Sequence, residues 1–313
     1  MSKRILVTGA QGFVGQKLCA YLSAAGHTVL RTDTQLPDDA QDTQVCNITD
    51  ASSVDALLEW AGDLDAVIHL AAITFVPQAQ ADPTRVMDVN LHGTMHLIEA
   101  MKQYTPKARL LFVSTSEVYG APQYLPIDEA HPVNPTNPYA ISKVAADYYC
   151  NYVAQAGDLD IVRMRPFNHS GPGQADHFVL SSFAHQLAAM ECGQQPPILQ
   201  VGNLEAARDF LHVDDVVRAY ALALEHGTSG EAYNLGSGKS RTIQSALDAL
   251  LTRVSLDIQV ERDPARMRPL AVPEIRASHN KFTACCGWKP EIPFETLLDE
   301  LLAYWRTAME DTK

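Results

Sequence analysis

The sequence predicts an α/β fold with a doubly wound parallel sheet and a smaller C-terminal lobe. In the first half, short β-rich runs alternate with helical patterns, which is typical of a parallel sheet flanked by helices. Two of these runs, AVIHLAA and RLLFVSTS, are nearly continuous apolar stretches, as expected for strands buried on both faces. A glycine-rich turn at 9–15 joins the first strand to the first helix, which makes the sheet Rossmann-type.

The elements follow in order along the chain. We expect strands at 4–8, 28–32, 66–70, 109–114 and 160–164, and helices at about 13–25, 52–60, 84–104 and 138–156. After RMRPFNHSGPGQ the strict alternation ends, and isolated helices are expected at 178–191, 242–252 and 294–308. A helix at 212–225 and a strand at 231–235 are expected to return to the main sheet. The predicted domains are therefore 1–165 with 208–236 for a cofactor, and 166–207 with 237–313 for a substrate.

Composition excludes several classes of partner. With 313 residues and a formal net charge of −13, the chain is long enough for about two domains and too acidic to attract nucleic acid or an anionic membrane. It shows no signal peptide and no apolar window of transmembrane length. The six cysteines have no metal-ligand spacing, so no metal site is expected, and reduced thiols indicate a cytoplasmic protein.

The glycine turn is the candidate cofactor site. Gly9, Gly12 and Gly15 allow a tight turn in which backbone N–H groups approach a pyrophosphate at a helix N-terminus. A plain strand–helix turn is the alternative, but the next strand ends in Asp33, where a ribose-binding acid is expected. The Asp33 carboxylate would repel a 2′-phosphate, which favours NAD(H), while Arg31 leaves NADP(H) open. Asn47-Ile48 are candidate adenine contacts, although Asn47 fits a simple turn equally well.

Tyr139 and Lys143 lie at i and i+4 of a predicted helix and so share a face. A nearby ammonium favours the phenolate, so we expect Lys143 to lower the pKa of Tyr139. Thr115 ends the fourth strand, where it can hydrogen-bond a carbonyl group while Tyr139 gives the proton as general acid. A YxxxK pattern alone usually marks an exposed helix face. Its combination with a Ser/Thr at a strand end and the glycine turn favours catalysis by hydride and proton transfer.

These residues resemble the extended short-chain dehydrogenase/reductase family, that is, the nucleotide-sugar epimerases, dehydratases and reductases. Its landmarks appear in order: TGAQGFVG, Asp33, IHLAA, VNLHGT, STSEVYG and YAISK. Further motifs over nearly the whole chain, RPFNHSGPGQ and VGNLEAARDF above all, resemble those of the GDP-4-dehydro-6-deoxy-mannose reductases. The resemblance implies reduction of the 4-keto group of a GDP-4-keto-6-deoxy-hexose by NAD(P)H, and a homodimer built on the helices at about 84–104 and 138–156. Core packing within one subunit explains the apolar face of the second helix nearly as well.

The resemblance also implies site residues by position. Lys143 would hold the nicotinamide ribose as well as assist Tyr139, and Asn90 would support the cofactor side of the site. Further cofactor contacts are implied at motif positions: Phe13, Val14, Leu70, Ala71 and Ala72. Implied substrate contacts are Thr74, Thr115, Ser116, Glu117, Asn168, Arg208 and Arg268, with the two arginines binding the diphosphate.

Alternatives stay open at several of these positions. Arg208 could instead pair with Asp209, Asp214 or Asp215, and Thr74 could be a simple loop threonine. His69 fits a buried core histidine, whereas His169 fits a core or a cleft position equally.

Glu117 also fits the acid of a 4,6-dehydratase, so a GDP-mannose 4,6-dehydratase or a nucleotide-sugar 4-epimerase is the alternative enzyme. A non-catalytic NAD(P)-sensing regulator is a distant alternative, because such a protein has no use for Tyr139 and Lys143.

Overall fold

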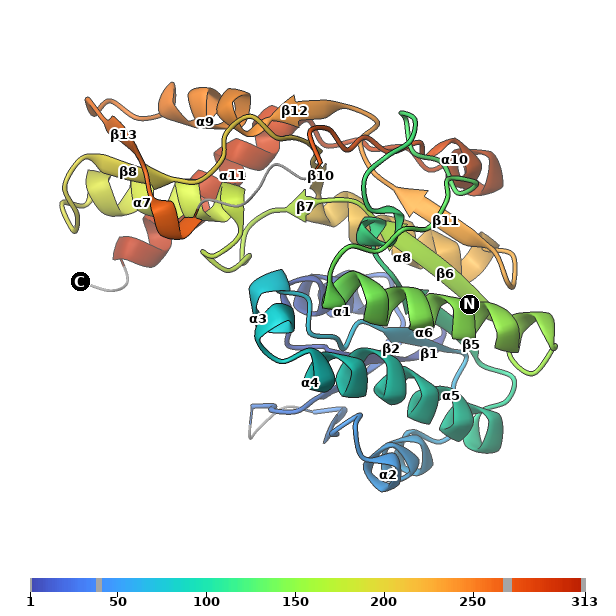
Figure 1. Cartoon of the computed structure of the whole chain (residues 1–313). Helices are drawn as coiled ribbons and strands as arrows, with labels where there is room; N and C mark the ends of the chain where they lie inside the picture. The colour runs from blue at the N-terminus through green and yellow to red at the C-terminus, as the bar shows by residue number, and fades with distance from the viewer. Residues whose placement is uncertain (1, 38–40, 267–271, 311–313) are drawn as a thin grey trace.

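The computed structural model describes residues 2–37, 41–266 and 272–310. A parallel sheet of seven strands forms the centre of the molecule, in the order β11-β6-β5-β4-β1-β2-β3 (Figure 1). Its strands are β1 (Arg4–Thr8), β2 (Thr28–Asp33), β3 (Thr43–Val45), β4 (Ala66–His69), β5 (Arg109–Val113), β6 (Ile161–Pro166) and β11 (Ala232–Leu235). The predicted doubly wound parallel sheet is confirmed, and its order reverses direction between β1 and β4.

Helices cover both faces of this sheet because its strands alternate apolar side chains between two cores. Ile5 and Val7 of β1 contact the layer of α1 (Phe13–Ala24) and α8 (Val213–His226). Leu6 faces the opposite layer, formed by three helices: α2 (Ala51–Ala61), α5 (Gly93–Tyr104) and α6 (Pro138–Gln155). Burial on both faces explains why the strand runs read as continuously apolar in the sequence.

The helix predicted at 84–104 is broken into three pieces. After α3 (Val76–Ala81), α4 (Pro83–Met87) leads into a π-helical turn at Asp88–His92, and α5 follows. Asp82 caps α4 by accepting the backbone N–H of Arg85 at 3.0 Å. The π turn places Asn90 in the interior, where its side chain holds the chain after β4. Side-chain periodicity does not distinguish a π turn from an α-helix, so the sequence predicted one continuous helix.

A second group of elements lies on one side of the sheet and has its own apolar core (Figure 1). Its helices are α7 (Val179–Glu191), α9 (Ile243–Leu251) and α11 (Phe294–Glu310). Three two-stranded sheets accompany them, pairing β7 (His169–Ser170) with β10 (Leu211–His212), β9 (Ala207–Asp209) with β12 (Ser240–Thr242), and β8 (Ile198–Val201) with β13 (Gln259–Arg262). The sequence did not predict these short strands.

The chain returns to the central sheet as expected. Helix α8 packs against α1, and β11 then pairs in parallel with β6 at the edge of the sheet. The short helix α10 (Asn280–Cys286) covers β11. In the part of the chain that the structure describes, every helix is too short or too polar to cross a membrane.

Candidate active site

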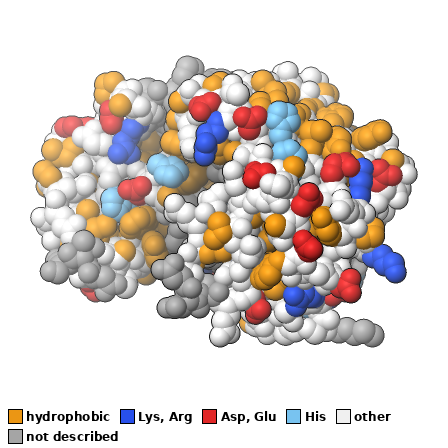
Figure 2. Space-filling model, turned by 90° about the horizontal axis from the view of Figure 1, so that it is seen from below, with side chains coloured by type: hydrophobic (Ala, Val, Ile, Leu, Met, Phe, Trp, Pro, Cys, Tyr) orange, Lys and Arg blue, Asp and Glu red, His pale blue; other side chains and the backbone are white. Residues whose placement is uncertain are grey.

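A large cavity lies where the carboxyl ends of the central strands meet the second group of elements. Its volume is about 1870 Å³. Figure 2 shows the molecule from below, with acidic and basic side chains interspersed over the coloured surface of that face. Most of the predicted site residues line the cavity: Gly9, Gly12, Phe13, Val14, Gly15, Asp33, Asn47, Ile48, Leu70, Ala71, Ala72, Thr74, Thr115, Ser116, Glu117, Tyr139, Lys143, Asn168 and Arg208. The edge of the sheet thus brings together residues that lie up to about 200 positions apart.

The glycine turn packs too closely for side chains. Gly9 has a φ of +69°, and a Cβ there would lie 2.7 Å from the backbone nitrogen of Ala71. A Cβ on Gly15 would lie 2.2 Å from the carbonyl oxygen of Gly9. Helix α1 begins directly after Gly12 without a side-chain cap, so its first N–H groups are open to an anion in the cavity. The residues present therefore fit a dinucleotide pyrophosphate.

Asp33 is held at the end of β2 by the glycine turn. One carboxylate oxygen accepts the backbone N–H of Gln11 at 3.0 Å, and the other accepts that of Thr34 at 2.8 Å. Arg31, two positions earlier on β2, does not line the cavity, and its side chain interacts with the thiol of Cys19. The Asn47 side chain accepts hydrogen bonds from Thr49, as in a simple turn, and Asn47 also lines the cavity.

A buried chain of hydrogen bonds supports the loop after β4. Thr8 Oγ1 accepts the backbone N–H of Ala71 at 3.2 Å and lies 2.7 Å from His69 Nδ1, and His69 Nε2 lies 3.1 Å from Thr94 Oγ1. Burial lowers the pKa of His69 to about 3, with a further contribution from Lys143. His69 is therefore a neutral core histidine, as interpreted from the sequence.

Asn90 belongs to the same support rather than to the cavity wall. It is 1% exposed, and its amide accepts the N–H of Ile73 at 2.8 Å and donates to the carbonyl of Ile73 and to Ser142 Oγ. Its side chain thus ties the cofactor-side loop to α6, in line with a supporting role and not with a direct contact.

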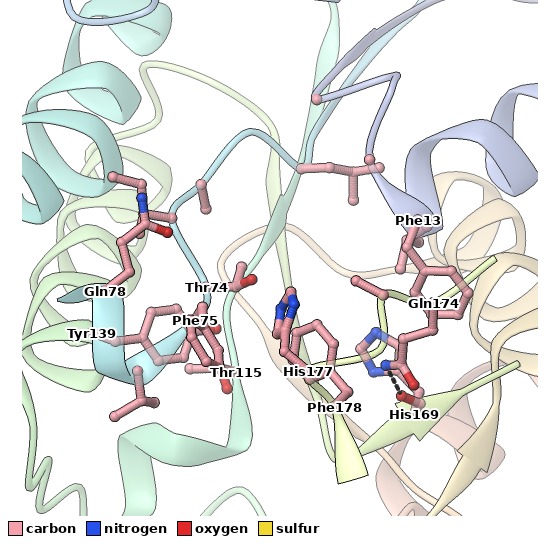
Figure 3. A pocket seen from close by; sticks show the side chains of 18 of the residues that line it. Phe13, Thr74, Phe75, Gln78, Thr115, Tyr139, His169, Gln174, His177 and Phe178 are labelled. Atoms are coloured by element: carbon pink, nitrogen blue, oxygen red, sulfur yellow. Dashed lines mark hydrogen bonds between the residues drawn. The ribbon is translucent and has the colours of Figure 1, made fainter. Parts of the chain in front are cut away.

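Tyr139 and Thr115 lie close together inside the cavity (Figure 3). Lys143 lines the same cavity, and all three side chains are almost completely buried. Asn137 caps α6 by accepting the N–H of Ala140, which places Tyr139 in the first turn. The Lys143 ammonium lies 4.5 Å from the centre of the Phe112 ring. Burial lowers the pKa of Lys143 to about 8.

The expectation that Lys143 acidifies Tyr139 is wrong for the protein without ligands. Burial raises the pKa of Tyr139 to about 12, a hydrogen bond with Thr115 opposes this rise, and the charge of Glu117 adds to it. The reason is that burial desolvates the phenolate, and this penalty is the largest contribution to the pKa of the group. The phenol is consequently protonated at neutral pH, which is the form that a proton donor needs.

Arg208 lines the cavity without the ion pairs considered as alternatives. Asp209 accepts backbone N–H groups instead, while Asp214 pairs with Lys17 and Asp215 with Arg218. Burial lowers the pKa of Arg208, and the charge of Glu117 opposes this shift. The Arg208 guanidinium donates to two backbone carbonyls, which leaves its charge available to an anion in the cavity.

The structure places the other predicted substrate-contact residues differently. Asn168 and Thr74 line the cavity from loops, and Glu117 accepts a 3.3 Å hydrogen bond from Asn137. Arg268 lies outside the described residues. Arg266, two positions earlier, does line the cavity and donates to Ser182 Oγ at 2.8 Å.

An aromatic contact across the cavity was not predicted from the sequence. Phe75, just before α3, meets His177 and Phe178, just before α7, with ring centres 4.4 and 6.2 Å apart (Figure 3). His169 also lines the cavity, and its ring stacks on Phe13 with centres 6.3 Å apart. Nothing in the sequence indicated this contact, because its two sides lie about 100 residues apart.

Comparison with known proteins agrees with this geometry. Residues 5–236 match the model of the NAD dependent epimerase/dehydratase family. The chain belongs to this family. It is 38% identical to a GDP-6-deoxy-D-mannose reductase of Pseudomonas aeruginosa, over 99% of this chain and all of the relative. It is also 30% identical to a UDP-glucose 4-epimerase of Mycolicibacterium smegmatis, over 97% of this chain and 98% of the relative.

Solved structures of this epimerase/dehydratase family share the fold over the same length. The structure of RMD from Pseudomonas aeruginosa complexed with NADPH has a TM-score of 0.88 at 37% identity and covers 98% of this chain and all of that one. A Thermus thermophilus UDP-glucose 4-epimerase in complex with NAD has a TM-score of 0.86 at 30% identity, over 97% of this chain and 99% of that one. The chain is thus an enzyme of an NAD(P)-dependent family.

Proposed function

We propose that this protein reduces the 4-keto group of GDP-4-dehydro-6-deoxy-D-mannose with NAD(P)H to give GDP-6-deoxy-D-mannose, or GDP-D-rhamnose. The observation that carries the proposal is the 38% identity over the full length of a GDP-6-deoxy-D-mannose reductase. The cavity supports it, because a protonated phenol, a hydroxyl group and a buried ammonium converge there.

The proposed roles follow from the positions of the side chains. A bound reduced nicotinamide would supply the hydride. Tyr139 gives its proton to the C4 oxygen, and Thr115 donates a hydrogen bond to the same oxygen, which aligns the ketone for the transfer. Lys143 stabilises the phenolate that Tyr139 becomes, because an ammonium next to a new negative charge lowers its energy.

We propose that the two parts of the chain divide the ligands between them. The sheet-bearing part, 1–165 with 208–236, holds the cofactor through the glycine turn and Asp33, whereas 166–207 and 237–313 contribute most of the nucleotide-sugar site. Arg208 and Asn168 contact the diphosphate and sugar from the cavity wall, and Arg266 lines the same cavity. Six free thiols suit a reducing cytoplasm.

An assay with two substrates tests this function. The purified protein is mixed with GDP-4-dehydro-6-deoxy-D-mannose and either NADH or NADPH, and the loss of absorbance of the reduced cofactor is followed. Consumption of cofactor with formation of a 6-deoxy-D-mannose product, its C4 configuration determined by NMR, supports the reductase. Turnover of GDP-mannose without added reductant identifies the dehydratase, and C4 epimerisation of a nucleotide sugar identifies the epimerase. No turnover of any of these substrates favours a cofactor-sensing regulator.

Glu117 is the residue that keeps the dehydratase as the second candidate. Its carboxylate lines the cavity, but it accepts a hydrogen bond from Asn137, and its charge acts on Arg208. These contacts fit a carboxylate that orients Arg208 at the cavity wall. We therefore assign Glu117 a substrate-positioning role.

We propose that the enzyme prefers NADH to NADPH, because the Asp33 carboxylate is fixed at the ribose end of the cavity and would repel a 2′-phosphate. The expected preference in kcat/KM is at least about tenfold, which corresponds to one modest charge interaction. Asp33→Asn should reduce this preference about tenfold, mostly by improving the use of NADPH. The measurement is steady-state kinetics with both cofactors.

Arg31→Gln is the matched control, since Arg31 interacts with Cys19, does not line the cavity and should leave the cofactor ratio unchanged. Equal or better use of NADPH by the unmodified enzyme would contradict the preference. The structure of the relative from Pseudomonas aeruginosa contains NADPH. The comparison of the two cofactors is therefore a stringent test of the proposed preference for NADH.

We also propose a homodimer that forms through α6. Ile141, Tyr148 and Tyr152 are 47%, 55% and 66% exposed and follow each other at intervals of seven and four residues, which places them on one helix face. Replacing Tyr148 and Tyr152 together by glutamate should convert the dimer to monomers, because the charges would be buried without partners. Sedimentation velocity at micromolar concentration measures the result.

The control for the dimer is Trp60→Glu, at an exposed apolar position of α2 away from this face. It should leave the oligomeric state unchanged. A monomeric unmodified protein, or a double variant that stays dimeric, would rule out this interface.

A further inference from the structure

A buried ionic cluster lies directly behind the catalytic lysine. Asp147 of α6 is 1% exposed, and its carboxylate is held by two arginines of β6. Asp147 Oδ1 lies 2.5 Å from Arg163 Nη1 and 2.9 Å from Arg165 Nη2, and Oδ2 lies 3.0 Å from Arg165 Nε. These contacts fix the carboxylate relative to the central sheet.

The arginines are anchored on their far sides. Arg165 donates to the Tyr119 hydroxyl at 2.9 Å, and Tyr119 donates to Asn234 of β11 at 2.7 Å. Arg163 donates to Asn151 at 2.8 Å and to the carbonyl of Gly230. Because both arginines are themselves held by further groups, the Asp147 carboxylate between them has little freedom to move.

Lys143 precedes Asp147 by four residues, so both side chains lie on the same face of α6. Other groups near the ammonium give it little negative charge. His69 of β4 is neutral, and the Phe112 ring of β5 offers only its face. Burial raises the pKa of the Cys150 thiol, which keeps that neighbour protonated.

The remaining neighbours are protonated, cationic or more remote. Tyr139 on α6 keeps its proton, Arg163 and Arg165 of β6 are cations, and Glu117 acts on Tyr139 and Arg208. Asp147 is therefore the carboxylate that acts on the lysine within the described part of the site.

We propose that Asp147 is a positioning residue for the reaction: clamped by Arg163 and Arg165, it fixes the turn of α6 that carries Lys143 and supplies the lysine with its negative counter-charge. The proposal rests on the proposed role of Lys143 in catalysis and cofactor binding, and it concerns a residue that does not line the cavity. Asp147 acts on the ligands only through the lysine.

The charge of Asp147 predicts the direction in which the pKa of Lys143 changes when the cluster is altered. Burial lowers the pKa of Lys143 to about 8, and Cys150 and Asp147 both oppose this shift. Of these two neighbours, only Asp147 carries a charge at neutral pH, because burial raises the pKa of the Cys150 thiol. Loss of the Asp147 charge would lower the lysine pKa further, so less of the ammonium would remain at neutral pH. Loss of one arginine would leave the carboxylate less neutralised and would raise the lysine pKa. If Asp147 had a purely structural role, these two kinds of variant would not shift the pKa of Lys143 in opposite directions.

The test is a direct titration of Lys143 in the ligand-free protein, by NMR of ¹³Cε-labelled lysine with Lys143→Met to assign the signal. We expect Asp147→Asn to move the titration midpoint down by roughly one pH unit and Arg165→Gln to move it up. Asp147→Glu should restore most of the native value. The alkaline limb of NADH binding, measured by fluorescence, should shift in the same directions.

Asn151→Ala is the matched control, because it removes a partner of Arg163 and leaves the charge of Asp147 in place. Its Lys143 midpoint should equal that of the unmodified protein. If Asp147→Asn does not fold, the upward shift of the Lys143 midpoint in Arg165→Gln is sufficient to test the proposal. Unchanged midpoints in the folded variants, or shifts of the same sign, would overturn the proposal. Since no substrate is needed, this outcome is independent of whether the enzyme proves to be a reductase.

Discussion

Tyr139→Phe is expected to reduce kcat by about three orders of magnitude, within the range for loss of a positioned general acid. The substitution removes one hydroxyl from a buried ring that packs with Ala79 and Val86, so the fold should persist. The dissociation constant for NADH should change by less than about threefold, since the glycine turn and Asp33 are untouched. Stopped-flow reduction of the ketosugar and fluorescence titration of NADH measure the two quantities separately.

Tyr149→Phe is the matched control for this change. It alters the same residue type on the same helix, where the hydroxyl bonds Glu99 at 2.9 Å outside the cavity. It should retain nearly native kcat. A Tyr139→Phe enzyme with substantial activity would exclude the phenol as proton donor, and a large loss of NADH affinity would indicate that Tyr139 mainly binds the cofactor.

Arg208→Ala is expected to raise the KM for the GDP-sugar roughly 100-fold while kcat changes little. The half-buried guanidinium faces the cavity without a carboxylate bridge, so a diphosphate would be its principal anionic partner. Removing one member of a desolvated charge pair has this order of effect. Because the contact is equally present in the ground state and the transition state, it should appear in KM rather than in kcat.

Arg208→Lys should recover only part of the affinity, because an ammonium cannot make the two parallel hydrogen bonds of a guanidinium. Arg241→Ala is the control, since Arg241 lies opposite Arg208 in the β9–β12 pair and stacks on Phe294. Isothermal titration with GDP provides a second measurement. Unchanged GDP affinity in Arg208→Ala would remove this arginine from the diphosphate site.

Much of the cofactor half of the site could be predicted because it is encoded locally. A glycine with φ of +69° and a glycine whose Cβ would lie 2.2 Å from a carbonyl oxygen leave no choice of residue, so Gly9 and Gly15 are visible in sequence. Tyr139 and Lys143 are related by helical spacing alone. The parallel sheet follows from the alternation of strand and helix patterns along the chain.

Prediction of the substrate-binding residues depended more on resemblance to a known family than on side-chain periodicity. Arg208 and Asn168 lie in short strands and loops whose pairing partners are distant, as in the β9–β12 pair. The contact of Phe75 with His177 joins two loops that have no common periodicity. Such contacts are decided by how the lobe packs on the sheet, which a single sequence does not express.

The sequence by itself determined the parallel α/β sheet, the glycine turn and the helical pairing of Tyr139 with Lys143, because backbone geometry and side-chain periodicity act over a few residues. Only the tertiary structure decided the ionisation of the site. Burial keeps Tyr139 protonated, lowers the pKa of Lys143 to about 8 and directs Asp147 to the arginines of β6. Desolvation depends on everything packed around a group, so no local pattern contains it.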